Sequence, residues 1–330
     1  CFLQGVMAQN STIYTEANLS YKKAMELYEE GIVGLAQTEF KNVFESLRPI
    51  QEPESVLLRT KAELFYAKCA VRLGQPDGEK LIIDFARTYD PDPLANQAIL
   101  EMADYYFNSK DYGRAAELFA SIDAFDLGRN QRSEVKFKLG YSYFVKKKFR
   151  EARIAFGEIR DIQNEYYYPS NYYYGMTSFY EDKYNEAISS FEKVERSKKY
   201  KPYIPYYITQ IYFAQGKYDE VINYGKDKTN DTTLKNLPEI NQLVGQAYFE
   251  KGEYDRALPH LEYYSNNTTK MRAEEYYQIG FTQKETGDCV KAAKNFERLS
   301  NVNSSLGQSA MYSLADCQIK NGDKQKARNA

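Results

Sequence analysis

The chain has 330 residues, 43% of them hydrophobic and 27% charged, which suffices for one large folded structure or two domains of ordinary size. Its formal net charge of -2 at pH 7 provides no bulk attraction to nucleic acid or to an anionic membrane, so we expect no nucleic-acid partner. No stretch of about 18 consecutive apolar residues occurs, and we therefore expect no transmembrane span.

The first eight residues, CFLQGVMA, differ in character from the rest of the chain. They start apolar and end with Val6 and Ala8 in the small-residue spacing of a signal-peptidase site, so we interpret residues 1–8 as a signal-peptide remnant cut before Gln9. Two alternatives stay open, an unstructured or artificial end and a lipoprotein with lipid on Cys1. Residues 9–16 are expected to form an N-terminal linker. The expected location is exported, in the periplasm or associated with the cell envelope.

From residue 17 onward the sequence repeats with a period close to 35 residues. The clearest copy starts at Leu139, LGYSYFVKKKFREARIAFGEI, and its small residue Gly140 serves as an anchor. An aromatic residue follows nine positions after the anchor, alanine twelve after it and a large apolar residue sixteen after it. The nine anchors are Ala24, Ala67, Ala103, Gly140, Gly175, Thr209, Gly245, Gly280 and Ala315. A fixed period over nearly the whole chain indicates a solenoid.

The offsets from the anchor have a physical cause. The anchor lies on the buried face of a first helix, and the alanine and large residue share one face of a second helix. Between them, seven positions after the anchor, a glycine recurs where a helix end favours the left-handed conformation. These glycines are Gly31, Gly74, Gly216, Gly252, Gly287 and Gly322. We therefore predict an all-α fold of about nine helix-turn-helix repeats.

This pattern resembles the tetratricopeptide repeat, a helix-turn-helix unit of about 34 residues. The leader adds a narrower similarity to exported arrays of Gram-negative bacteria. The resemblance implies a right-handed α-α superhelix spanning residues 17–330. Its repeats are expected to start near residues 17, 60, 96, 133, 168, 202, 238, 273 and 308.

Two repeats depart from the pattern. The one anchored at Thr209 has Val221 for the usual alanine and Gly225 for the large apolar residue, which predicts a local irregularity. The ninth stops at Ala330, one position before its large apolar residue would come. We expect that further repeats or another module follow, and that the ninth repeat is the least protected segment.

Residues suited to catalysis or metal binding are sparse. Cys69, Cys289 and Cys317 each lie in a helical pattern, which favours buried free thiols, with a bridge between the last two as the alternative. The single histidine, His260, has no cysteine or acidic residue at metal-ligand spacing. Phosphate-loop, dinucleotide, zinc-protease and hydrolase motifs are all missing from the sequence. We therefore expect no enzyme activity, no metal and no cofactor.

The resemblance implies that first helices line a concave groove that binds a partner segment. Groove-facing positions lie three before and one after each anchor. The candidate partner-binding residues are Phe137, Tyr141, Tyr172, Met176, Tyr206, Gln210, Tyr277 and Phe281. Residues four after the anchor belong either to this groove or to the packing between helices. The expected function is a non-catalytic protein–protein interaction scaffold in cell-envelope assembly or maintenance. The alternative is a glycan-binding protein that stacks sugars on the groove tyrosines.

Overall fold

The computed structural model of the protein describes residues 2–122 and 127–329, with side chains described for 11–122 and 127–328. The chain divides into two compact units, residues 1–173 (unit 1) and residues 174–330 (unit 2), and each is described by itself. All regular secondary structure in the described residues is helical. The predicted all-α class is confirmed.

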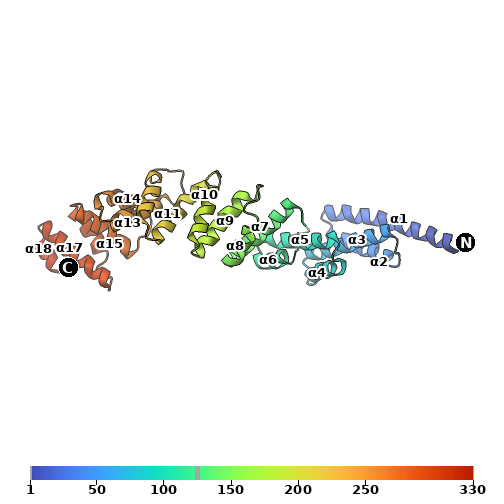
Figure 1. The fold of residues 1–330 in the computed structure, drawn as a ribbon. Coiled ribbons are helices and arrows are strands. Elements are labelled where there is room, and N and C mark those ends of the chain that lie inside the picture. Colours follow the sequence, from blue (N-terminus) through green and yellow to red (C-terminus); the bar gives the residue numbers. More distant parts are fainter. Residues whose placement is uncertain (1, 123–126, 330) are drawn as a thin grey trace. The chain divides into compact units, whose positions relative to one another are not determined.

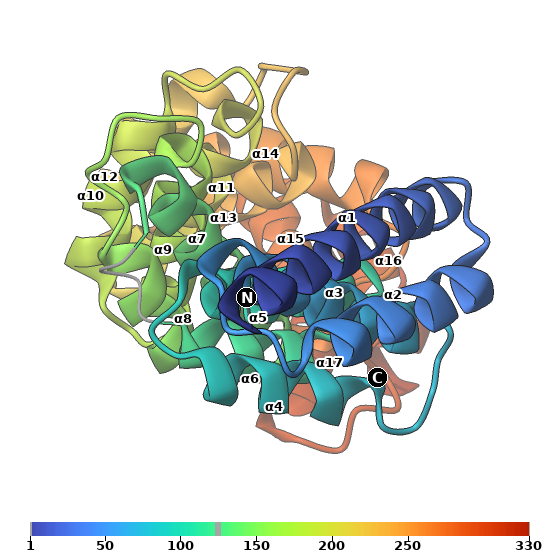
Figure 2. The same cartoon turned by 90° about the vertical axis from the view of Figure 1, so that its right-hand side faces the viewer.

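Unit 1 is built from consecutive helix pairs (Figure 1). Its first helices are α1 (Phe2–Glu29), α3 (Pro53–Arg72), α5 (Pro93–Asn108) and α7 (Arg129–Val145). Its second helices are α2 (Val33–Leu47), α4 (Gly78–Tyr89), α6 (Tyr112–Ser121) and α8 (Phe149–Gly157). Each of these helices packs on the next in chain order, as Figure 2 shows for α1 and α2. Every pair thus covers the apolar face of its neighbour.

Unit 2 continues the same plan, and α9 (Tyr167–Tyr180) carries the chain from one unit to the other. Its further first helices are α11 (Ile204–Ala214), α13 (Leu237–Glu250), α15 (Ala273–Glu285) and α17 (Ser305–Lys320). Its second helices are α10 (Tyr184–Val194), α12 (Tyr218–Gly225), α14 (Tyr254–Asn267), α16 (Cys289–Glu297) and α18 (Lys324–Asn329). Two 3-10 turns, η2 (Lys201–Tyr203) and η3 (Lys226–Lys228), precede α11 and follow α12.

Each helix pair contains one left-handed residue in its turn, seven positions after the anchor. Six are the predicted glycines, with φ between +65° and +93°. The other three are Lys110, Lys147 and Asp182, with φ of 63°, 58° and 55°. In the fourth pair the Lys147 and Lys148 amides donate to carbonyls of the preceding helix turn, at 2.9 Å each. The shared feature is therefore the left-handed turn itself, which glycine adopts without strain.

The small anchors are explained by the side chain that packs on them. A Cβ at Gly140 would lie 2.7 Å from a ring carbon of Phe156, and one at Gly175 would lie 2.6 Å from Phe191. Both phenylalanines are fully buried, sixteen positions after the anchor. The two helices of a pair can approach this closely because the anchor has no side chain.

Stacked aromatic rings join some neighbouring repeats. Phe156 stacks on Tyr173 with ring centroids 5.6 Å apart and planes inclined by 20°. Phe191 stacks on Tyr207 with the same distance and inclination, and Phe40 stacks on Phe65 at 5.3 Å. The second ring of each pair lies two positions before the next anchor. These contacts fix the register of one repeat on the next.

The repeat anchored at Thr209 is irregular, as predicted. Its second helix α12 is short and passes directly into η3. Gly225 stands where other repeats have a large apolar residue, and a Cβ there would lie 2.6 Å from a methyl carbon of Val244. Val244, from the next first helix, is fully buried. The Val244 side chain of the next repeat therefore packs where a large apolar side chain at position 225 would otherwise lie.

The segment predicted as a linker, residues 9–16, is helical and belongs to α1. The reason is packing, because Ile13 and Tyr14 contact the same apolar cluster that buries Ala17 and Phe40. Cys1, the alternative lipid site, lies outside the described residues.

Candidate aromatic site

Two groups of aromatic rings occupy identical register positions, one group in each unit. In each group, two rings come from positions four and nine after one anchor, and two from positions three before and one after the next anchor. The unit 1 four-ring cluster is Phe107, Tyr112, Phe137 and Tyr141, and the unit 2 four-ring cluster is Phe249, Tyr254, Tyr277 and Phe281. All eight side chains are half-buried.

The unit 1 four-ring cluster is arranged around Tyr141. This ring meets Phe107 at 5.8 Å and Tyr112 at 5.7 Å, with planes inclined by 62° and 70°. Phe137 lies 6.3 Å from Tyr141 at an inclination of 28°. Phe137 also meets the buried Phe156 at 5.7 Å and Tyr166 at 5.3 Å, and Tyr173 lies 6.0 Å from Phe137 and 5.3 Å from Tyr141. Rings at such distances attract one another through edge-to-face and offset contacts.

In the unit 2 four-ring cluster the four rings are arranged in the same way around Phe281. This ring meets Phe249 at 5.8 Å and Tyr254 at 5.6 Å, with inclinations of 76° and 64°. Tyr277 lies 5.8 Å from Phe281 at 30° and 6.0 Å from the buried Phe296. Because the residues differ while the geometry agrees, the arrangement belongs to the repeat register.

A lysine held by carboxylates flanks each cluster. In unit 1 the Lys138 ammonium lies 6.0 Å from the Phe107 ring centre and pairs with Asp104 at 2.7 Å. Burial opposes the charge of Lys138, but hydrogen bonds to nearby carboxylates outweigh it and raise its pKa above the ordinary value. In unit 2, Lys284 lies 5.7 Å from the Phe281 ring centre and pairs with Asp316 at 3.1 Å. Apolar rings thus border ionised groups in both units.

The structure divides the predicted groove residues into four groups. Phe137 and Tyr141 meet in one cluster, and Tyr277 and Phe281 meet in the other. Tyr172, Tyr206 and Gln210 are half-buried outside these clusters, where the two tyrosines pack against Tyr173 and Tyr207. Burial raises the pKa of Tyr206. Met176 is only 5% exposed, contrary to the expectation of a groove-facing side chain.

Phe107, Tyr112, Phe249 and Tyr254 are not among the predicted partner-binding residues. The residue nine after the anchor was predicted only to open the second helix. The residue four after it, such as Phe249, was predicted to lie either in the groove or in the packing between helices. A signal was nevertheless present, because only two neighbouring repeat pairs carry aromatic residues at all four register positions. Recognising it requires pairing residues across a repeat boundary.

The His260 side chain contacts two neighbouring side chains, Asn241 and Tyr248. Its Nδ1 lies 2.9 Å from the Asn241 Oδ1, and its ring is nearly parallel to that of Tyr248, with 13° between the planes. Burial lowers the pKa of His260, and the positive charge of Arg256 adds to this effect. Among the described residues, no group of three or more histidine, cysteine, aspartate or glutamate side chains could hold a metal ion.

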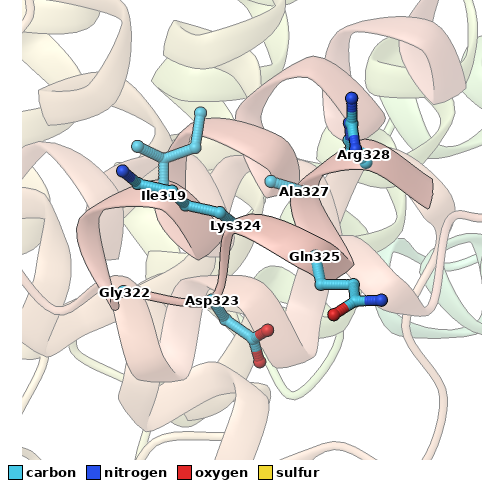
Figure 3. Close-up of a pocket in the computed structure, with 7 residues that line it drawn as sticks. All are labelled: Ile319, Gly322, Asp323, Lys324, Gln325, Ala327 and Arg328. Atoms are coloured by element: carbon cyan, nitrogen blue, oxygen red, sulfur yellow. The ribbon is translucent and has the colours of Figure 1, made fainter.

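A broad surface hollow of 1050 Å³ lies at α17 and α18 (Figure 3). Its walls combine apolar and charged side chains, including Ile319, Lys324 and Arg328. The carboxylate in this wall, Asp323, is paired with Lys326 at 2.7 Å. The hollow has a mixed lining and brings no aromatic rings together. Separately, none of the helices in the described part of the chain has the length and apolar character that crossing a bilayer requires.

Comparison with known proteins identifies the repeat. The family model described as tetratricopeptide repeat matches residues 309–330, the ninth helix pair. No protein of curated function has a significant match to the chain.

Among solved structures, PilF of Pseudomonas aeruginosa has a TM-score of 0.48 and 13% identity, over 65% of this chain and 95% of its own. PilW, a type IV pilus biogenesis factor, has a TM-score of 0.46 and 16% identity, over 67% of this chain and 100% of its own. A tetratricopeptide repeat protein from Parabacteroides merdae has a TM-score of 0.40 and 12% identity, over 93% and 99%.

Proposed function

We propose that this chain, an array of tetratricopeptide repeats, is a non-catalytic scaffold that binds a segment of a partner protein at its four-ring clusters. The observation that supports the proposal is the repetition of one half-buried aromatic geometry at the same register in both units. Aromatic side chains with part of their surface open to solvent are frequent anchors of protein interfaces.

The ring geometry favours a protein segment over a sugar. In the edge-to-face pairs, the edge of one ring meets a face of the next, at inclinations between 62° and 76° for Tyr141 and Phe281 with their Phe neighbours. Such packing leaves less flat ring face open for a sugar to stack on. An extended or helical segment can instead place apolar side chains against the half-buried rings, while the flanking lysine–carboxylate pairs suit its polar groups.

We propose a cell-envelope location for the scaffold, on the basis of the Val6-x-Ala8 spacing at the end of the apolar start. Expressed with its full leader in a Gram-negative host, the protein should be exported and begin at Gln9. N-terminal sequencing of the fractionated protein tests this location. An intact leader on cytosolic protein would contradict it.

The binding function is tested with substitutions that the repeat already accommodates. The position one after the anchor is Gln210 in the sixth repeat and Gln246 in the seventh. Tyr141→Gln and Phe281→Gln therefore remove a central ring while keeping a side chain that this register tolerates. Each variant should weaken partner binding by about 1–3 kcal/mol, the usual loss for an interface anchor.

The matched control is Ile154→Ala, which removes an exposed apolar side chain from α8 in the same repeat as Tyr141; Ile154 is 54% exposed. Proteins captured from an envelope extract by the wild-type array should also be captured by this control and lost with the two ring variants. Equal capture by all four proteins would refute binding at the clusters. Saturable binding on a glycan array, lost in the ring variants, would favour the sugar-binding alternative.

A further inference from the structure

Two buried cysteines from successive helix pairs lie together in unit 2. The Sγ atoms of Cys289 and Cys317 are 2.7 Å apart, which is closer than non-bonded heavy atoms of this size pack. Cys289 opens α16 and Cys317 lies in α17, so a bond between them would join the eighth and ninth repeats. We propose that these two thiols form a disulfide that crosslinks the two repeats when the protein meets a disulfide oxidant.

The repeat register explains why these two side chains meet. Cys289 lies nine after its anchor, where four other repeats have a tyrosine that opens the second helix: Tyr112, Tyr184, Tyr218 and Tyr254. Cys317 lies two after the next anchor. Both thiols belong to the apolar cluster that also contains Phe296 and Leu314.

The third cysteine of the described helices supplies an internal comparison. Cys69 also lies two after its anchor, and the residue nine after the preceding anchor is Val33, which opens α2. Both belong to one apolar cluster in unit 1. In the repeat register Cys69 therefore corresponds to Cys317, and Val33 corresponds to Cys289, so no crosslink is expected there.

The chemistry is an ordinary thiol–disulfide exchange. One thiolate attacks a sulfur of the oxidant, either oxidised glutathione or the disulfide of a thiol oxidoreductase, and releases one reduced thiol. The second cysteine thiolate then attacks the mixed disulfide and releases the second reduced thiol. The protein loses two protons and two electrons, and the electrons reduce the oxidant.

Burial decides when this exchange happens. Cys317 is fully buried and Cys289 is 7% exposed, so Cys289 is the sulfur that an oxidant reaches first. Burial, reinforced by the neighbouring Cys289, raises the pKa of Cys317 to about 12, and a thiol with such a pKa reacts slowly. The bond therefore forms while the last repeats are open or still folding.

The first experiment maps the thiols of the full chain carrying Cys1→Ser. The protein is unfolded in urea and refolded in a buffer of oxidised and reduced glutathione. It is then alkylated with N-ethylmaleimide in urea, because Cys69 is fully buried in the folded chain. Peptide mass spectrometry should find the peptides of Cys289 and Cys317 joined, with alkylation on Cys69 alone. Cys289→Ser and Cys317→Ser should each remove the joined species. Alkylation of all three cysteines, or glutathione adducts without a crosslink, would overturn the proposal.

The second experiment uses the register equivalence. Val33→Cys, in a chain with Cys1→Ser, Cys289→Ser and Cys317→Ser, should create a new crosslink with Cys69 under the same refolding conditions. A third measurement uses the chain that carries only Cys1→Ser. Its oxidised form should exchange the amides of α16 and α17 more slowly than its reduced form. The expected slowing is on the order of a hundredfold for openings that separate the two helices. Equal amide exchange in the oxidised and the reduced protein would overturn the proposed disulfide.

Discussion

Replacing Lys147 by glycine is expected to stabilise the fourth repeat. Lys147 has φ of 58°, a left-handed conformation that costs an L-residue about 1–2 kcal/mol. Glycine adopts it freely but loses about 0.5–1 kcal/mol of backbone entropy on folding. The difference predicts a gain of about 0.5–1 kcal/mol for Lys147→Gly. The hydrogen bond from the residue 147 amide to the Phe144 carbonyl, 2.9 Å, is kept.

The preceding lysine is the matched control. Lys146 has φ of -80° and ψ of 5°, so glycine relieves no strain there and only adds freedom to the unfolded chain. Lys146→Gly should therefore destabilise the repeat by about 0.5–1 kcal/mol. Both variants remove one positive charge from the same exposed turn, so a general effect of charge would act equally on the two.

The assay combines urea unfolding, followed by circular dichroism, with amide exchange in α7 and α8. Exchange is needed because repeat arrays unfold in segments and need not follow one two-state transition. The two variants should move stability in opposite directions. The reasoning is refuted if Lys147→Gly is as destabilising as Lys146→Gly. The inverse change, Gly252→Lys, should cost about 1 kcal/mol through backbone strain alone, since a Cβ there meets no atom within 4 Å.

Three further outcomes are expected. Gly140→Ala should lower stability by about 1–2 kcal/mol because its Cβ would press on Phe156, whereas Gly280→Ala, with its nearest contact at 3.1 Å, should be close to neutral by thermal unfolding. Glu275→Gln should cost about 2 kcal/mol at pH 7, since burial opposes ionisation of the carboxylate but hydrogen bonds from Arg272 and others hold its pKa below 4.5. That difference should vanish as unfolding is measured at pH values falling through the depressed folded pKa. His260 takes up its proton less readily when folded, so stability should fall as pH drops below 6.5, and His260→Gln should remove that part of the pH dependence.

Much of the fold could be predicted because the 35-residue period combines several independent signals. Gly140, the aromatic Phe149 and the buried Phe156 each predict part of one helix pair. The turn at Lys147 was not predicted as left-handed, since lysine has no preference for that conformation and only its place in the register forces it.

The site was harder to predict than the fold. Tyr141 and Phe281 were recognised from their place after the anchor, yet their partners Tyr112 and Tyr254 were assigned only to helix starts. Burial also depends on the neighbouring repeat, so Met176 was expected in the groove although it is buried. A position within one repeat does not by itself reveal which side chains the next repeat brings against it.

The register equivalence of the four-ring clusters has an evolutionary consequence. Two of the four rings of such a cluster are also present in the sixth repeat. Phe213 and Tyr218 lie four and nine positions after their anchor, and their ring centroids are 5.6 Å apart. The two remaining positions are Gln242 and Gln246, whose amides now bond Glu275 and Gln278. Changing both glutamines to aromatic residues would complete the arrangement in the seventh repeat. A duplicated repeat can therefore gain or lose a recognition element by point substitution, without any change in its backbone.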